Sequence, residues 1–132
     1  MSATFHLAIP AGNLSISENF YVGLLGCPMG NREEGRWVDI DFWGNELTLH
    51  KSVEALPSVV HDVDMGKVPV PHFGAHLTKE EFQKLKNRIE DSDFDYFERP
   101  YRRFIDTEFE QETFFLEDPN GNILEFKNML NS

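Results

Sequence analysis

The sequence predicts an α+β fold in which one unit, a strand followed by a helix and three strands, occurs twice. Apolar residues alternate in several short segments, as in half-buried strands. Two stretches place apolar residues at helical spacing after a capping-box pattern. Phe5-His6 matches Pro71-His72, and Gly44-Asn45 matches Gly121-Asn122. These matches indicate two halves with a common plan.

The first half begins with a strand over 5–9, where Phe5, Leu7 and Ile9 alternate with smaller or polar residues. The pattern over 15–18 predicts a capping box that opens a helix ending at Gly26. Residues 28–36 are poorly patterned and predict either a strand or a loop. Segments 37–43 and 46–51 then alternate cleanly on either side of Gly44-Asn45, which predicts a hairpin.

The second half follows a connector over 52–70, in which prolines and glycine interrupt any regular period. A strand over 71–77 leads into a second capping box at 78–81 and a helix that ends near residue 91. An arginine-rich strand over 96–104 contains Pro100, which favours a sheet edge. The extra length of the second half is placed in this arm. The first module therefore spans about 4–51 and the second about 71–128, within a single domain of residues 1–132.

The last hairpin places a carboxylate in the middle of a strand. Residues 118–122 (Asp-Pro-Asn-Gly-Asn) form its turn, because proline presets φ and Asn or Gly accepts a positive φ. On the outgoing strand Leu124 and Phe126 share one face, and Glu125 lies on the other. A lone glutamate in such a position usually faces solvent. The residues on the other strands favour a functional reading instead.

The composition of the chain limits the classes of partner that it is expected to bind. The chain has 132 residues, a net charge of −11 and a pI near 4.7. This charge disfavours nucleic acid and anionic membrane surfaces, so a small-molecule substrate is expected. Cys27 is the single cysteine and cannot form an intramolecular disulfide, and the first residues lack the regions of a signal peptide. No apolar run approaches the roughly 20 residues of a membrane span. A cytoplasmic location is expected.

Four of the predicted strands share a division of residue types. Their large apolar residues have one parity, and the opposite face presents His6, Thr48, His72 and Glu125. If the two units curve and lie side by side, these positions converge. His6, His72 and Glu125 then form a site of two histidines and one carboxylate. Such a site leaves open positions on a six-coordinate Fe(II), Mn(II), Co(II) or Ni(II) ion.

These motifs resemble the vicinal oxygen chelate superfamily, which contains glyoxalases, bleomycin-resistance proteins and extradiol dioxygenases. The similar segments cover nearly the whole chain: residues 5–8, 20–26, 71–74 and 117–125. The resemblance implies two βαβββ modules that form a curved, barrel-like mixed sheet with helices on its outer face. It implies a metal held by His6, His72 and Glu125, and a substrate that chelates the metal through vicinal oxygens. It also implies a homodimer or a pairing of the two modules within one chain.

The sequence departs from the family pattern at three places. Thr48 occupies the position of a fourth ligand in glyoxalase-type members. Phe115 occupies the position of a tyrosine in extradiol dioxygenases, and Asn45 and Glu46 lie where an acid/base histidine is expected. His50 shares a face with Thr48 and is the local candidate for a proton shuttle or a fourth ligand. Fe(II) is the first expectation for the metal, with Mn(II), Ni(II), Co(II) and Zn(II) as alternatives.

Other polar and aromatic residues are candidates for substrate binding, and each has a structural alternative. Trp37 forms an apolar substrate wall or caps the sheet, and Asp39 faces the cavity or belongs to a charged rim. Arg103 binds a substrate carboxylate bidentately or is a surface residue. Thr48 and Phe115 complete the predicted substrate-binding set.

Two functions remain open from the sequence. One is a metal-dependent dioxygenase or a glyoxalase-like lyase or isomerase. The other is a non-catalytic protein of the bleomycin-resistance kind that binds a drug or metabolite without metal.

Overall fold

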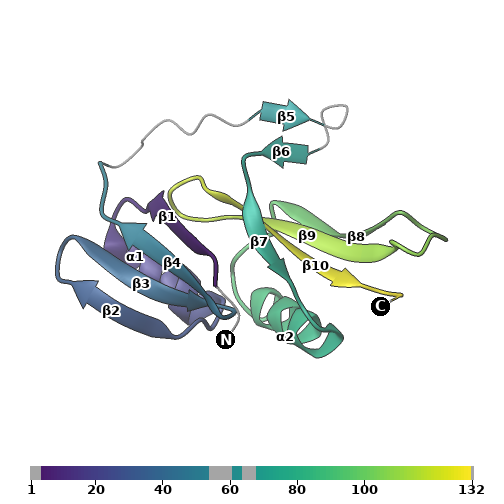
Figure 1. Cartoon of the computed structure of the whole chain (residues 1–132), viewed down its shortest axis with the longest axis horizontal. Coiled ribbons are helices and arrows are strands. Elements are labelled where there is room, and N and C mark those ends of the chain that lie inside the picture. The colour runs from purple at the N-terminus through teal and green to yellow at the C-terminus, as the bar shows by residue number, and fades with distance from the viewer. Residues whose placement is uncertain (1–3, 54–60, 64–67, 132) are drawn as a thin grey trace. The chain divides into compact units, whose positions relative to one another are not determined.

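The computed structural model describes residues 4–53, 61–63 and 68–131 (Figure 1). The chain divides into two compact units, Met1–Pro57 and Ser58–Ser132. Each contains one module of a strand, a helical segment and three strands, so the predicted α+β fold with two βαβββ modules is confirmed. Neither α-helix in the described ranges has the length and apolar run needed to cross a membrane.

Module one is a four-stranded mixed sheet with a helical segment. Its elements are β1 (His6–Pro10), α1 (Leu14–Glu18), the π-helix η1 (Asn19–Leu24), β2 (Met29–Glu33), β3 (Trp37–Phe42) and β4 (Asn45–His50). The strand order is β1-β4-β3-β2, with β1 parallel to β4 and the other pairs antiparallel. Val38, Ile40 and Phe42 on β3 are buried, as their alternation predicted.

Module two repeats this topology. Its elements are β7 (Phe73–His76), α2 (Lys79–Glu90), β8 (Glu98–Arg103), β9 (Gln111–Glu117) and β10 (Ile123–Met129). The strand order is β7-β10-β9-β8, with β7 parallel to β10. Gly74 lies opposite Glu125 as Ala8 lies opposite Thr48, so the two sheets share one register. Thr48 and Glu125 therefore occupy equivalent positions.

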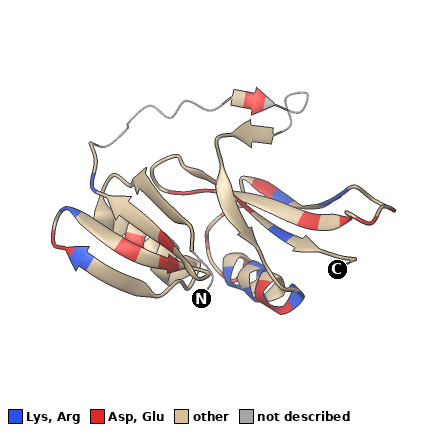
Figure 2. Cartoon of the chain, in the orientation of Figure 1, with Lys and Arg blue, Asp and Glu red and all other residues tan. Residues whose placement is uncertain are grey.

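The capping box predicted at 78–81 is confirmed. Thr78 Oγ1 accepts from the Glu81 backbone N–H, and the Glu81 carboxylate accepts from the Thr78 N–H. Phe82, Leu85 and Ile89 are buried along one side of α2. Lysine, arginine and glutamate residues occupy much of the rest of this helix (Figure 2). The capping-box pattern thus predicted the start of α2, and the amphipathic pattern predicted its packed face.

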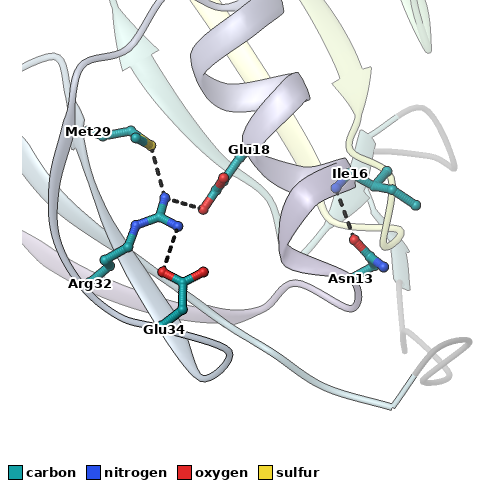
Figure 3. Close-up of polar contacts among 6 residues, drawn as sticks. All are labelled: Asn13, Ile16, Glu18, Met29, Arg32 and Glu34. Carbon is teal, nitrogen blue, oxygen red and sulfur yellow. Dashed lines mark hydrogen bonds and ion pairs between the residues drawn. The ribbon is translucent and has the colours of Figure 1, made fainter.

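Two predictions about module one are wrong. The helix begins two residues earlier than the Ser15 pattern indicated, because the Asn13 side chain accepts from the Ile16 N–H (Figure 3). Phe5 is 67% exposed instead of packing under the helix. It precedes β1, and its backbone N–H donates to the side chain of Asn45.

Arg32 links the helical segment of module one to β2. Its guanidinium lies 2.5 Å from Glu18 Oε1 and 3.5 Å from Glu34 Oε2 (Figure 3). The pair with Glu18 ties the edge strand to the end of α1.

The connector is more ordered than predicted. Residues His61–Val63 (β5) and Val68–Val70 (β6) pair as a short antiparallel hairpin, so the prediction of no regular structure across 52–70 is wrong there. His61 is exposed. Pro57 and Gly66, which motivated the prediction, lie outside the described residues.

Candidate functional site

The two faces of the sheet in module two have different roles. Phe114 and Phe126 face α2, and the Phe114 ring centroid lies 5.2 Å from that of Phe82. Side chains alternate along a strand, so Phe115 and Glu125 lie on the opposite face. We call this opposite face the inner face of module two.

Glu125 is buried on the inner face. Its exposed fraction is 4%, which excludes the solvated reading. The Thr113 hydroxyl donates to Glu125 Oε2 at 2.6 Å. A buried carboxylate is costly unless it is paired and hydrogen-bonded, so Oε1 also needs a partner.

His72 supplies a partner for Glu125 Oε1. Its Nε2 lies 3.1 Å from that oxygen, and its Nδ1 lies 2.6 Å from the carbonyl oxygen of Pro69. A carbonyl can only accept, so the Nδ1 nitrogen carries a proton. In the neutral imidazole the lone pair of Nε2 then points toward an anionic oxygen. The contact between Nε2 and Oε1 is therefore attractive only if a proton or a cation lies between these two atoms.

The same two atoms suit a divalent metal. Bonds of about 2.1 Å to nitrogen and oxygen are usual for such ions, and two adjacent donors at right angles are then about 3 Å apart. The observed separation of 3.1 Å fits this arrangement. The Pro69 carbonyl also provides the outer hydrogen bond that orients a metal-binding histidine.

The surroundings of this pair are partly apolar. The Phe115 ring is fully buried and meets His72 edge-on, with ring centroids 5.4 Å apart. Val68 and Val70 on β6 pack with Phe115, Ile123 and Tyr101. The connector hairpin therefore covers part of the inner face and supplies the carbonyl that holds His72.

Lys127 introduces a positive charge beside the pair. Its Nζ lies 3.7 Å from Glu125 Oε1, and the side chain is 29% exposed. Lys127 is two residues beyond Glu125, on the same face of β10.

Gly74 lets two strands meet at this point. A Cβ built on Gly74 would overlap the backbone oxygen of Glu125. The position therefore cannot take a larger residue without moving β10.

The equivalent face of module one carries a different polar set. Thr48 Oγ1 donates to Asp39 Oδ1 at 2.7 Å. His6 Nδ1 lies 2.7 Å from Glu46 Oε1, with both side chains more than half exposed. A cavity of about 310 Å³ in this module is bordered by Asp39, Asp41 and Glu46, among others.

The remaining predicted residues make other contacts. Trp37 Nε1 donates to Glu33 Oε2, and the exposed His50 is the register partner of Trp37. The Arg103 guanidinium lies over the Phe104 ring, 5.0 Å from its centroid. Within the described ranges no three His, Cys, Asp or Glu side chains form a metal-binding group. His72, Glu125 and Phe115 come together in module two, and His6 belongs to module one.

Sequence reasoning missed Thr113, Lys127 and the Pro69 carbonyl. Thr113 and Lys127 share the parity of Glu125, so the alternation of the hairpin contained a signal for both. The Pro69 carbonyl has no such signal, because it depends on the path of the connector.

Comparisons with known proteins agree with this architecture. A glyoxalase/bleomycin resistance protein/dioxygenase from Alicyclobacillus acidocaldarius is 33% identical, with 97% of this chain and 92% of that chain covered and a TM-score of 0.76. A lactoylglutathione lyase from Agrobacterium tumefaciens shares the fold at 22% identity, with 97% and 94% coverage and a TM-score of 0.66. The fosfomycin resistance protein FosX from Listeria monocytogenes does so at 12% identity, with 97% and 93% coverage and a TM-score of 0.71.

The other comparisons gave no match: neither a protein-family model nor a curated protein matches the chain. The assignment therefore rests on the Alicyclobacillus protein, whose identity extends over nearly the full length of both chains. The chain belongs to the glyoxalase/bleomycin resistance protein/dioxygenase family.

Proposed function

We propose that the protein is a divalent-metal-dependent enzyme of the glyoxalase or extradiol dioxygenase type, acting on a small substrate that chelates the metal through vicinal oxygens. The observation that carries this proposal is the contact between His72 Nε2 and Glu125 Oε1, with the other ends of both side chains already hydrogen-bonded. Two donor atoms thus face one point from a partly apolar surface. His6 would complete the ligand set from module one.

Each residue of the proposed site has a distinct task in the proposal. A bound divalent ion supplies Lewis acidity and a template for two adjacent oxygens. Thr113 holds Glu125 Oε2, which leaves Oε1 directed at His72. Phe115 excludes water behind His72. His50, exposed at the end of β4, is the proposed proton shuttle.

Metal binding tests the proposal directly. Protein prepared without chelator should contain close to one equivalent of divalent metal, and Mn(II) titration of metal-free protein should give a matching stoichiometry. His72→Ala and Glu125→Gln should each weaken Mn(II) binding by about 10- to 100-fold or more, because each removes a ligand. His61→Ala removes an exposed histidine on β5 and is the matched control. Equal affinity in the wild type and His72→Ala contradicts the proposal.

Turnover then identifies the reaction. Protein reconstituted anaerobically with Fe(II), Mn(II), Co(II), Ni(II) or Zn(II) should be assayed with catechols and with glutathione hemithioacetals. Oxygen-dependent ring cleavage assigns a dioxygenase, and isomerisation of the hemithioacetal assigns a glyoxalase.

One observation favours the alternative of a non-catalytic binding protein. Lys127 and a protonated His72 together can balance the charge of Glu125 without metal. This alternative predicts that drug or metabolite binding persists in excess chelator and that no metal supports turnover. Loss of ligand binding in chelator supports the metalloenzyme.

A further inference from the structure

Lys127 lies beside the proposed metal ligand Glu125, and Gln111, which is buried, lies further along the same face of the sheet. Lys127 and Thr113 are register partners on β10 and β9, and Gln111 pairs with Met129 one step further along. Partners in an antiparallel pair point to the same side, so Lys127 and Gln111 are diagonal neighbours on the inner face. Long side chains at such positions can reach a common ligand.

Gln111 is the more buried of the two. Its exposed fraction is 5%, and its amide carries two N–H donors and a carbonyl acceptor. The side chain therefore offers donors and an acceptor on the same face as Glu125.

Lys127 adds charge at the same place. Its ammonium has three donor hydrogens and lies 3.7 Å from Glu125 Oε1. A divalent ion held by Glu125 and His72 would neutralise the negative charge of the Glu125 carboxylate. The ammonium would then face a second cation in a partly buried setting, where like charges repel strongly. An anionic group placed between the two cations removes this repulsion.

We propose that Lys127 and Gln111 bind a carboxylate of the substrate, next to the vicinal oxygens that chelate the metal. This inference rests on the proposed function, because the chelating oxygens place the carboxylate. It also restricts the substrate to molecules that carry an anionic group, although the chain as a whole has a net charge of −11 and repels anions.

The first experiment uses Mn(II)-loaded protein under anaerobic conditions. Catechol is compared with 2,3- and 3,4-dihydroxybenzoate by calorimetry. Catechol has no carboxylate, and the two dihydroxybenzoates carry one at different ring positions. Wild type should prefer at least one dihydroxybenzoate over catechol by about tenfold. Lys127→Met should abolish this preference, and Lys127→Arg should retain most of it. Gln111→Met should reduce it.

Two controls accompany this experiment. Lys86→Met removes a positive charge from α2, where Lys86 pairs with Glu112, and should leave the preference intact. Mn(II) affinity should not fall in Lys127→Met, because the change removes a cation from beside the ion. Equal preferences in the wild type and Lys127→Met overturn the inference.

The second experiment needs no metal. In metal-free Glu125→Gln, Lys127 loses its carboxylate partner and should bind dihydroxybenzoate about tenfold more tightly than metal-free wild type does. The double variant Glu125→Gln/Lys127→Met should lose this gain, and far-ultraviolet circular dichroism should show that both variants are folded. Equal affinities in the two variants contradict the carboxylate site. Failure of wild type to bind Mn(II) would instead refute the proposed function, and this second experiment still decides the role of Lys127.

Discussion

The hydroxyl of Thr113 is the group that holds the buried carboxylate of Glu125. Thr113→Val keeps the shape of the side chain and removes the donor to Glu125 Oε2. The free energy of unfolding should fall by about 1–3 kcal/mol, because a buried acceptor is left unpaired. Urea denaturation measures the change. Thr113→Ser retains the hydroxyl and should lose less, and an equal loss in both variants would show that the methyl group matters instead.

Gly74 permits the close approach of β7 and β10. Gly74→Ala places a Cβ against the Glu125 backbone oxygen and should destabilise the protein by about 1–3 kcal/mol. Gly23→Ala is the matched control, since a Cβ there has no atom within 4 Å. Thermal denaturation of both variants provides the comparison. A Gly74→Ala protein as stable as Gly23→Ala would contradict the observed strand contact.

Tyr96 makes the free energy of unfolding depend on pH in the alkaline range. Burial, and then the hydrogen bond from its hydroxyl to Glu90, raise the pKa of Tyr96 above its usual range. The folded protein therefore retains this proton where the unfolded chain releases it. The contribution of Tyr96 to stability is complete below about pH 10, the unfolded pKa, and is lost as the pH rises toward the folded pKa. Tyr96→Phe should lose less unfolding free energy than the wild type as the pH rises, because it lacks this ionisable hydroxyl.

Urea denaturation of the wild type and Tyr96→Phe, at about pH 9 and about pH 11, measures this difference. The gap in unfolding free energy between the two proteins should narrow at the higher pH. A constant gap would show that Tyr96 titrates alike in both states.

The site was predictable from the sequence where it depends on strand parity. The alternation around Glu125 correctly placed the residue opposite Leu124 and Phe126. Its burial was not predictable, because that depends on Thr113, Phe115 and the valines of β6 acting together. The role of the Pro69 carbonyl was likewise out of reach, since backbone groups have no sequence signature.

At the level of elements, Asn13 begins the helical segment of module one. Asn13→Ala should cost about 1 kcal/mol of unfolding free energy, because the Ile16 N–H loses its acceptor. Ser15→Ala should have little effect, since Ser15 is exposed and is not the cap. Urea denaturation distinguishes the two. A larger effect at Ser15 would restore the original prediction of a capping box there.

Elements were predictable where a local pattern and the tertiary structure agree. The Gly44-Asn45 hairpin, the box at 78–81 and the turn at 118–122 each follow from residues next to one another in sequence. The π-helix η1 and the β5–β6 hairpin were missed. Their sequences hold no period or turn signal that separates them from an α-helix or a surface loop.

At the level of the whole molecule, metal binding should stabilise the folded chain. On the proposed function, ligands come from both modules. A Mn(II) concentration about 100 times the dissociation constant should add about 2.7 kcal/mol to the unfolding free energy. Differential scanning calorimetry measures the shift, which should shrink in His6→Ala as well as in His72→Ala. A full shift in His6→Ala would show that module two binds the ion alone.

The two sheets share one register, but they carry different charges at equivalent positions. Thr48 stands where module two has Glu125, and its hydroxyl is given to Asp39. A glutamate introduced at residue 48 would meet the carboxylates of Asp39 and Glu46, and His50 occupies the position equivalent to Lys127. A single substitution at residue 48 therefore would not give module one a counterpart of Glu125.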